Sequence, residues 1–174
     1  MINTDRLELT VISTHDVNDV FKYVSNPHTM RYERSEFKSK TDLIKFLDYF
    51  QKNKYAYSIR EIGNNRVIGH VTLSPTSPTF NNEYNLGYIL HEAYQGKGYC
   101  TEACKAIIDY SFGVLKIHRI RAACNPENIA SWKVMEKCGL KKEAHFKSKV
   151  CFRNDEFGNP IYTDEYVYGI INKN

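Results

Sequence analysis

Apolar and polar residues alternate along several stretches of the chain, as they do in β-strands with one buried face. Leu7-Glu8-Leu9-Thr10-Val11 is the first of these stretches. The same alternation predicts strands at residues 55–60, 66–73, 84–90, 119–124, 150–153 and 162–171. Gly63-Asn64-Asn65 predicts a hairpin turn between the strands on either side of it. The chain is therefore expected to build a sheet.

Other stretches space their apolar residues three or four positions apart, which is typical of one face of a helix. The first predicted helix follows Ser13 or Thr14 and ends before Pro27. A short last helix begins near Ser131 and ends at Gly139, a residue suited to a left-handed cap. The apolar faces of the first three helices consist of Val17, Val20, Phe21 and Val24, then Leu43, Phe46, Leu47 and Phe50 after Thr41, and then Ala103, Ile107, Tyr110 and Val114.

Strands and helices follow one another in the predicted order β-α-α-β-β-β-α-β-α-β-β. This order indicates an α/β fold in which helices cover both faces of one mixed, mostly antiparallel central sheet. The proline-containing segment 74–82 is interpreted as a polar loop that is too short to link two domains. We therefore expect residues 1–174 to form a single domain.

The composition indicates a globular protein and limits the classes of partner that it is expected to bind. Hydrophobic residues make up 42% and aromatic residues 13% of the chain, more than is usual in a disordered protein. The formal charge is only +4, from 24 basic and 20 acidic residues. The densest basic run, residues 137–149, is interpreted as a solvated face, so no direct nucleic-acid partner is expected. The alternative is an RNA or ribosome-surface binder that uses Lys141, Lys142, Lys147, Lys149 and Arg153.

The cysteines and the start of the chain indicate the compartment. The 5 cysteines are odd in number and form no C-x-x-C pair, which argues against a disulfide framework and a metal site. Cys100 and Cys104 lie four residues apart on a predicted helix and are interpreted as buried thiols. No apolar run approaches the ~18 residues that span a membrane, and Met1-Ile2-Asn3-Thr4-Asp5 is not a signal peptide. We therefore expect a cytoplasmic protein with no membrane partner.

A glycine-containing loop, Gln95-Gly96-Lys97-Gly98-Tyr99-Cys100-Thr101-Glu102-Ala103, joins a predicted strand to a predicted helix. A helix N-terminus carries about half a positive charge and several unpaired N–H groups, so this position suits a phosphate. The P-loop of nucleotide-binding proteins needs Ser or Thr after Gly-Lys, but Gly98 follows Lys97. The dinucleotide fingerprint needs a third glycine where Thr101 stands. Neither of these phosphate-binding motifs is therefore expected.

Gln95-x-x-Gly98-x-Cys100 instead resembles the Q/R-x-x-G-x-G/A pyrophosphate loop of the GNAT superfamily of acyl-CoA-dependent N-acyltransferases, with cysteine in place of the last small residue. Leu86-Gly87-Tyr88-Ile89-Leu90 before the loop is similar to the RimJ/RimL-type branch of that superfamily. The block from Asn125-Pro126-Glu127-Asn128 to Lys137-Cys138-Gly139-Leu140 and the opening Thr4-Asp5-Arg6-Leu7 are similar to it as well. The resemblance covers nearly the whole chain.

The resemblance implies that acetyl-CoA is the acetyl donor, with its pyrophosphate on backbone N–H groups of the loop. The strand before the loop is expected to separate from its neighbour and to leave backbone groups free for the pantetheine arm and the thioester carbonyl. The residues that the resemblance places at the cofactor are Ile89, Leu90, Gln95, Gly96, Lys97, Gly98, Tyr99, Cys100, Thr101, Asn128 and Ser131.

The implied reaction is direct attack of a neutral amine on the acetyl carbonyl, with no covalent enzyme intermediate. Asn128 would bind the pantetheine amides, and the Ser131 hydroxyl would bind the sulfur and donate its proton. The alternative is that Asn128 only caps a helix in whose first turn Ser131 lies. Glu83, at the start of the strand before the loop, is the candidate base. The alternative is that Glu83 is only a solvated glutamate at the end of a strand. His70 and His91 are weaker candidates, because surface histidines are common.

Arg31 and Tyr32, followed by Glu33, lie in the loop between the first two helices, where the RimJ/RimL-type branch lines its acceptor pocket. The alternatives are aromatic packing for Tyr32 and solvated charges for the other two. About a tenth of an α-amine but only ~0.04% of a lysine amine is neutral at pH 7, so an α-amine needs little help from a base. We expect a protein or peptide N-terminus as the acceptor. The alternative acceptors are a polyamine, an amino acid or an antibiotic. The alternative to an enzyme is a CoA-binding sensor without turnover. A homodimer is compatible with the resemblance.

Overall fold

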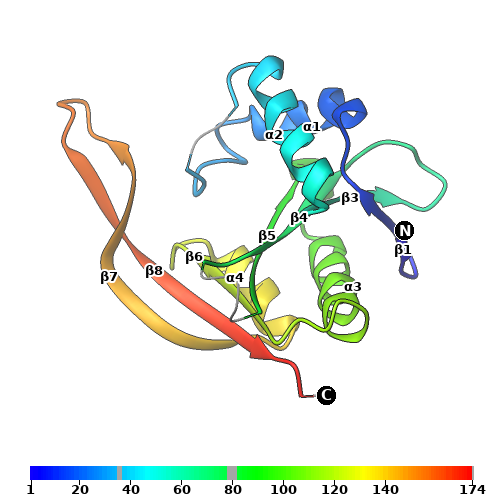
Figure 1. Cartoon of the computed structure of the whole chain (residues 1–174). Coiled ribbons are helices and arrows are strands. Elements are labelled where there is room, and N and C mark those ends of the chain that lie inside the picture. Colours follow the sequence, from blue (N-terminus) through cyan, green and yellow to red (C-terminus); the bar gives the residue numbers. More distant parts are fainter. Residues whose placement is uncertain (35–36, 78–81, 174) are drawn as a thin grey trace.

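An eight-stranded mixed sheet forms the centre of the computed structural model, which describes residues 1–34, 37–77 and 82–173 (Figure 1). The strand order is β1-β2-β3-β4-β5-β6-β8-β7. Only β5 and β6 pair in parallel, and the other neighbours are antiparallel. The strands are β1 (Ile2–Asn3), β2 (Leu7–Val11), β3 (Ala56–Glu61), β4 (Gly69–Pro75), β5 (Glu83–Leu90), β6 (Arg119–Cys124), β7 (Lys141–Asn154) and β8 (Pro160–Ile171). The predicted mostly antiparallel α/β sheet is confirmed.

Helices cover both faces of this sheet (Figure 1). They are α1 (Val17–Val24), α2 (Lys40–Asn53), α3 (Tyr99–Gly113) and α4 (Ile129–Lys137), with short 3-10 helices at Thr14–Asp16 and Glu92–Tyr94. One core contains α1 and α2, and Ile89 of β5 packs against it. The other core contains α3 and α4 and includes Leu90, because neighbouring residues of a strand face opposite sides. Within the described ranges, no helix has the length and apolar character that crossing a membrane requires.

Some predicted boundaries differ from those observed. The α4 helix begins at Ile129 rather than near Ser131, and β4 begins at Gly69 rather than at residue 66. Val114, predicted on the buried face of α3, is 64% exposed because it is the cap residue beyond the last helical turn. Gly139 adopts φ +88°, so the predicted left-handed cap is confirmed. Part of the predicted loop 74–82 belongs to β4, and residues 78–81 lie outside the described ranges.

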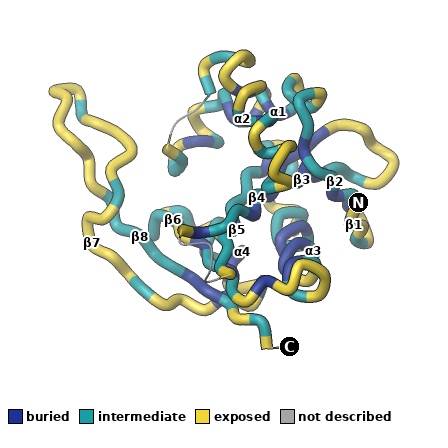
Figure 2. Tube along the Cα trace, viewed as in Figure 1, coloured by how far each residue is buried: buried dark blue, intermediate teal, exposed yellow. Residues whose placement is uncertain are grey.

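The β7–β8 hairpin extends away from the rest of the sheet (Figure 1). Its first strand was predicted only at residues 150–153, but β7 runs from Lys141 to Asn154 and is mostly exposed (Figure 2). A charged edge strand with neither face in the core shows no alternation of apolar and polar residues, so its pattern does not predict it. Residues 141–149 of the basic run therefore lie on an exposed edge strand, consistent with their interpretation as a solvated face, whereas Lys137 belongs to α4.

Candidate functional site

An opening separates the C-terminal halves of β5 and β6. These strands pair only from Glu83 to Asn85 on β5 and from Arg119 to Arg121 on β6. Beyond these residues β5 continues along β4 as far as Leu90, and β6 continues along β8 as far as Cys124. The strand separation that the family resemblance predicts is therefore present.

The alternation of the β4–β5 ladder fixes which backbone groups face this opening. His91 N–H donates to the Ile68 carbonyl at 2.9 Å and Thr76 N–H donates to the Glu83 carbonyl at 2.8 Å, so odd-numbered residues of β5 direct their N–H and C=O groups towards β4. Even-numbered residues consequently direct theirs towards β6. The backbone groups of Tyr88 and Leu90 thus face the opening, whereas Ile89, which we predicted there, turns its backbone groups to β4.

The glycine loop leads from this opening into α3. Gly96 and Gly98 adopt φ values of +76° and +82°, a region that side chains with a Cβ rarely occupy. A Cβ on Gly96 would meet no atom within 4 Å, so the loop presents bare backbone on that side. Among the described residues, no protein group accepts a hydrogen bond from the N–H groups of residues 96–101. The loop therefore has the free donors and the close approach that a phosphate requires.

The N-terminal segment holds the loop from behind. Glu102, in the first turn of α3, accepts a hydrogen bond from Thr4 Oγ1 at 2.6 Å and from Arg6 N–H at 3.0 Å, and it forms an ion pair with the Arg6 guanidinium at 2.6 Å. Arg6 also donates to the Lys97 carbonyl at 3.1 Å. Burial opposes ionisation of Glu102, but these hydrogen bonds outweigh it and lower its pKa. The motifs around Arg6 and around Glu102, far apart in sequence, thus form one structural unit.

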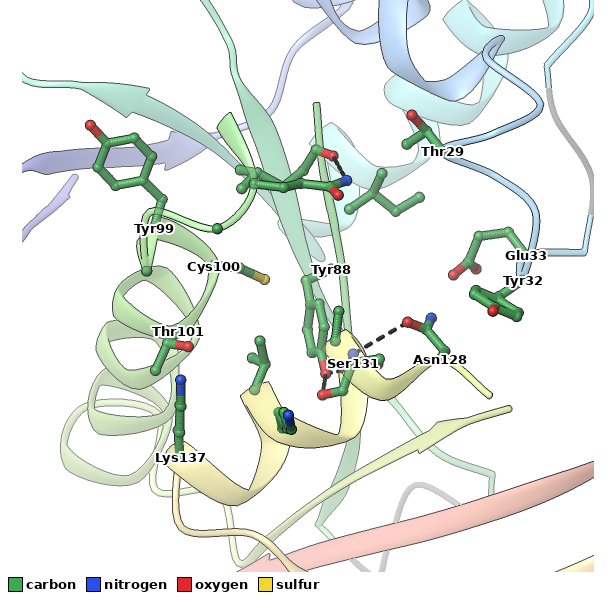
Figure 3. A pocket seen from close by; sticks show the side chains of 18 of the residues that line it. Thr29, Tyr32, Glu33, Tyr88, Tyr99, Cys100, Thr101, Asn128, Ser131 and Lys137 are labelled. Atoms are coloured by element: carbon green, nitrogen blue, oxygen red, sulfur yellow. Dashed lines mark hydrogen bonds between the residues drawn. The ribbon is translucent and has the colours of Figure 1, made fainter. Parts of the chain in front are cut away.

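A cavity of about 310 Å³ lies between the loop, β5 and α4, a size suited to part of a small-molecule ligand (Figure 3). Its walls include most of the residues predicted at the cofactor: Ile89, Leu90, Gln95, Gly96, Gly98, Tyr99, Cys100, Thr101, Asn128 and Ser131. Lys97 is not among the lining residues, and its ammonium lies 5.3 Å from the centre of the Tyr94 ring. The Gln95 side chain donates to the Leu90 carbonyl at 3.0 Å, which leaves the Leu90 N–H facing the opening.

Ser131 lies in the first turn of α4, close to Tyr88 of β5 (Figure 3). The Tyr88 hydroxyl is 3.0 Å from Ser131 Oγ and donates to the Ser131 carbonyl at 2.8 Å. Burial raises the pKa of Tyr88 far above its usual range, so this hydroxyl stays protonated. Asn128 caps α4, because its side-chain oxygen accepts from Ser131 N–H at 3.3 Å. The capping interpretation of Asn128 is thus confirmed, and its side chain also lines the cavity.

A second cavity of about 330 Å³ adjoins the first on the side of β6, β7 and β8. Asn128 and Ser131 line both cavities. So do Arg31, Tyr32 and Glu33, from the loop between α1 and α2. The predicted acceptor residues and the predicted acid therefore meet at the junction of two cavities.

Charged side chains line both cavities. Lys133 and Lys137 of α4 line the first cavity, and Lys137 points towards the first turn of α3 (Figure 3). Glu33, Asp164 and Glu165 line the second, together with Arg31 and Arg153. Sequence reasoning missed Thr29, Tyr88, Lys133, Val134, Lys137 and the β8 carboxylates as lining residues. The i, i+4 spacing of Lys133 and Lys137, one helical turn apart beside Ser131, was the available signal.

The structure does not bring the other candidate bases to either cavity. Glu83 is at the opposite end of β5 from the opening, ~16 Å along the strand from Tyr88, and forms an ion pair with Arg119 at 2.6 Å. Burial lowers the pKa of His70 to about 4, and its Nδ1 lies 2.8 Å from the Tyr23 hydroxyl. His91 caps a 3-10 helix, with Nδ1 accepting from Ala93 N–H at 3.2 Å.

Comparison with known proteins identifies the family. The chain matches the Acetyltransferase (GNAT) domain family over residues 6–141. It is 31% identical over 173 residues to the uncharacterized N-acetyltransferase YnaD of Bacillus subtilis, covering 98% of this chain and 96% of YnaD. The chain therefore belongs to the GNAT acetyltransferase family, whose members named in these comparisons are N-acetyltransferases.

Two solved structures share this fold at 22% sequence identity. The ribosomal-protein-S5-alanine acetyltransferase of Vibrio fischeri superimposes with a TM-score of 0.82, covering 99% of this chain and 96% of the other. The spermidine N-acetyltransferase of Vibrio cholerae, in complex with CoA and spermine, superimposes with a TM-score of 0.81 and covers 97% of each chain. Identity at this level establishes the fold alone, so the acceptor has to be argued from the residues of the site.

Proposed function

We propose that the protein transfers the acetyl group of acetyl-CoA to a primary amine in a ternary complex, and that the amine is the N-terminal α-amine of a peptide or protein. One observation carries the reaction: the opening between β5 and β6 connects a phosphate-suited loop with a second, carboxylate-lined cavity, and Ser131 lies at the junction. Donor and acceptor would meet there from opposite sides, which lowers the entropic cost of their encounter.

The residues of the first cavity fit acetyl-CoA. The free N–H groups of residues 96–101 would bind the pyrophosphate, and Lys137 would add a positive charge beside them. The Asn128 side chain accepts from Ser131 N–H and keeps its NH₂ group for a pantetheine carbonyl. Acetyl-CoA supplies an activated acetyl group with a thiol as leaving group. The N–H groups of Tyr88 and Leu90 would stabilise negative charge that develops on the carbonyl oxygen, an effect worth ~3 kcal/mol.

Ser131 would supply the proton that the sulfur takes, and Tyr88 would orient its hydroxyl. The Tyr88 hydroxyl stays protonated and lies 3.0 Å from Ser131 Oγ, so it would hold the Ser131 hydroxyl in place rather than give up a proton itself. Burial raises the pKa of Cys124, at the end of β6, to about 11, and its thiol is therefore neutral and a poor nucleophile at pH 7. This supports direct transfer to the amine over a covalent cysteine intermediate.

A polyamine is the second candidate acceptor. The carboxylates of Glu33, Asp164 and Glu165 in the second cavity favour a substrate with more than one positive charge. However, Asp164 already accepts from Lys147 and His145, and Arg31 and Arg153 line the same cavity. This mixture of charges suits a peptide, which carries an amine and polar backbone groups, at least as well.

A thiol-release screen with acetyl-CoA tests the proposal. The panel contains peptides with free N-termini, polyamines, amino acids and aminoglycosides, each at several concentrations. We expect the highest kcat/KM with a peptide α-amine. Preference for spermidine would support the polyamine acceptor instead. Tight binding of acetyl-CoA by calorimetry, with no thiol release from any amine, would leave a CoA-binding sensor and overturn the enzymatic proposal.

A further inference from the structure

The Glu33 carboxylate is held in an unusual environment for a loop glutamate. Glu33 lies beyond α1, and its backbone N–H donates to the Met30 carbonyl at 2.9 Å. Its side chain lines both cavities, and Figure 3 shows it directed inwards beside Tyr32, above Asn128. Within the described ranges, no hydrogen bond or ion pair engages the carboxylate. A solvated loop charge was the alternative to an acceptor contact for this residue, and its half-buried side chain at the two cavities favours the acceptor contact.

A half-buried carboxylate without a charged partner is costly, and contacts on both sides hold the loop that carries it. Tyr32, the preceding residue, donates to the Glu127 carbonyl at 3.3 Å, which ties the loop to the turn before α4. The Arg153 guanidinium of β7 donates to the Met30 carbonyl at 3.3 Å and ties the same loop to the hairpin. These contacts hold Glu33 at the junction even though none of them neutralises its charge. The site therefore keeps a free acceptor of protons where the two cavities meet.

We propose that Glu33 is the catalytic base of this enzyme, which accepts the proton of the acceptor ammonium at the junction of the two cavities. This inference rests on the proposed acetyl transfer. In the step, the ammonium N–H bond breaks and its proton passes to a Glu33 oxygen. The nitrogen lone pair then forms a C–N bond with the thioester carbonyl carbon, the C–S bond breaks, and the sulfur leaves with the Ser131 proton. The nitrogen gives up its second proton to the Ser131 oxygen, which restores the hydroxyl, and Glu33 later releases its proton to solvent.

Glu33 fits this role better than the other carboxylates of the described chain. Glu83 is engaged by Arg119 and lines neither cavity. Asp164 accepts hydrogen bonds from Lys147, His145 and the Ser148 N–H, and it lines only the second cavity. The Glu165 carboxylate also forms no side-chain hydrogen bond or ion pair with the described residues, but it too lines only the second cavity. Among these carboxylates, Glu33 alone lines both the first and the second cavity.

The partial burial of the Glu33 carboxyl changes its basicity in the direction that a catalytic base needs. Burial raises the pKa of the Glu33 carboxyl above its usual range, which makes the carboxylate a stronger base than a solvated one. Below this raised pKa the group is protonated and cannot accept a proton, so activity rises with pH through it. The charged and titratable groups that line the same two cavities are Arg31, Tyr32, Tyr88, Tyr99, Lys133, Lys137, Cys100, Cys124, Arg153, Asp164 and Glu165, and the second cavity contributes charges of both signs.

Substitution Glu33→Gln tests the proposal, with Glu127→Gln as the matched control. Glu127 is exposed and lines neither cavity, although it lies in the turn that Tyr32 contacts. The assay is thiol release with the panel amine of highest turnover. We expect Glu33→Gln to lower kcat/KM by about 10²-fold or more at pH 7 and Glu127→Gln to leave it unchanged. The dissociation constant for acetyl-CoA, measured by calorimetry, should be the same in all three proteins.

The pH profile separates a base from a structural residue. With a base present, log kcat/KM is flat between the pKa of Glu33 and that of the amine. In Glu33→Gln only neutral amine reacts, so log kcat/KM should rise with unit slope up to the amine pKa. Glu33→Asp, which keeps a carboxylate, should restore the flat region at reduced activity.

Three outcomes would overturn the inference. One is a Glu33→Gln variant with a wild-type profile. Another is a loss confined to the KM of the acceptor, which would make Glu33 a binding group only. The third is wild-type protein that releases no thiol with any amine, in which case the proposed function fails as well.

Discussion

At the scale of single residues, the Ser131–Tyr88 pair is the most informative contact in the molecule. Two hydroxyls at 3.0 Å sit at the end of the strand opening, where a sulfur and a nitrogen would be neighbours. We expect Ser131→Ala to lower kcat by about 10²-fold while changing the dissociation constant of CoA by less than about threefold. Single-turnover rates and calorimetry measure the two quantities. Equal losses in both would indicate that Ser131 only supports the structure.

Gly98 tests the phosphate-binding role of the loop. Replacement by valine adds a side chain next to the free N–H groups and strains a residue at φ +82°. We expect the CoA dissociation constant to rise at least about tenfold. Gly158→Val is the control, because Gly158 has a similar φ of +86° in the β7–β8 turn, far from the loop. If both variants weaken CoA binding equally, backbone strain and not the phosphate contact explains the loss.

Sequence reasoning selects loop residues that the structure gathers at the first cavity, but it does not predict which carboxylate lines a cavity, for a physical reason. Gln95, Gly98 and Thr101 are neighbours in sequence, so a local motif is enough to bring them together. The positions of Glu83 and Glu33 relative to the cavities depend on which end of β5 separates from β6 and on how a loop distant in sequence folds over that end. Such choices follow from tertiary packing, and the apolar pattern of one chain carries little information on them.

At the scale of elements, the N-terminal segment acts as a support for α3. Glu102 accepts from Thr4 and Arg6, and its lowered pKa means that this contact stabilises the fold above the usual glutamate pKa and is lost as the pH falls. Arg6 is partly exposed, so the ion pair itself contributes only a fraction of a kcal/mol, ~0.2–1. Arg6 also donates to the Lys97 carbonyl, so its loss is expected to affect ligand binding more than stability.

We therefore expect Arg6→Ala to weaken CoA binding about three- to tenfold, while the melting temperature falls by only a few degrees. The reason is that the Lys97 carbonyl and the first turn of α3 lose their common anchor. Calorimetry and thermal denaturation measure the two effects. Lys22→Ala, which removes an exposed ion pair with Asp19 on α1, is the control and should leave CoA affinity unchanged. An Arg6 variant with wild-type affinity would contradict the supporting role.

The strands show how far a pattern of apolar residues can predict elements. Strands β2, β3, β5 and β6 have buried residues on at least one face, and each was predicted within a few residues of its ends. The edge strand β7 has no buried face, and most of it was missed. Periodicity reports burial rather than backbone pairing, so it fails where a strand is held by its hydrogen-bond ladder alone.

At the scale of the whole molecule, the β7–β8 hairpin completes a wall of the second cavity, called the acceptor cavity below because we propose that the acceptor binds there. Val150, Phe152 and Ile161 of the hairpin line that cavity, opposite the loop that carries Tyr32 and Glu33. The lysines of β7 are engaged separately: Lys147 bonds Asp164, Lys142 lies over the Tyr166 ring and Lys149 over the Phe146 ring. This dispersal favours a solvated face over a single nucleic-acid surface.

Arg153 is the side chain that joins this hairpin to the rest of the site. Its guanidinium crosses from β7 to the Met30 carbonyl, and it lines the acceptor cavity. Loss of one hydrogen bond of this kind costs ~1 kcal/mol, or roughly a two- to tenfold change in an equilibrium constant. We expect Arg153→Ala to raise the KM of the acceptor by this factor, because the two walls no longer keep a fixed spacing, and to leave the CoA dissociation constant unchanged.

Steady-state kinetics at saturating acetyl-CoA measure this effect, and Lys149→Ala provides the comparison. Lys149 lies on the same strand and carries the same charge, but it lines neither cavity. A rise in acceptor KM for both variants would indicate that only the charge of the hairpin matters. A rise for Arg153→Ala alone would show that the hairpin and the α1–α2 loop act together, so that the acceptor site depends on segments more than a hundred residues apart, 123 in the case of Arg153 and Met30.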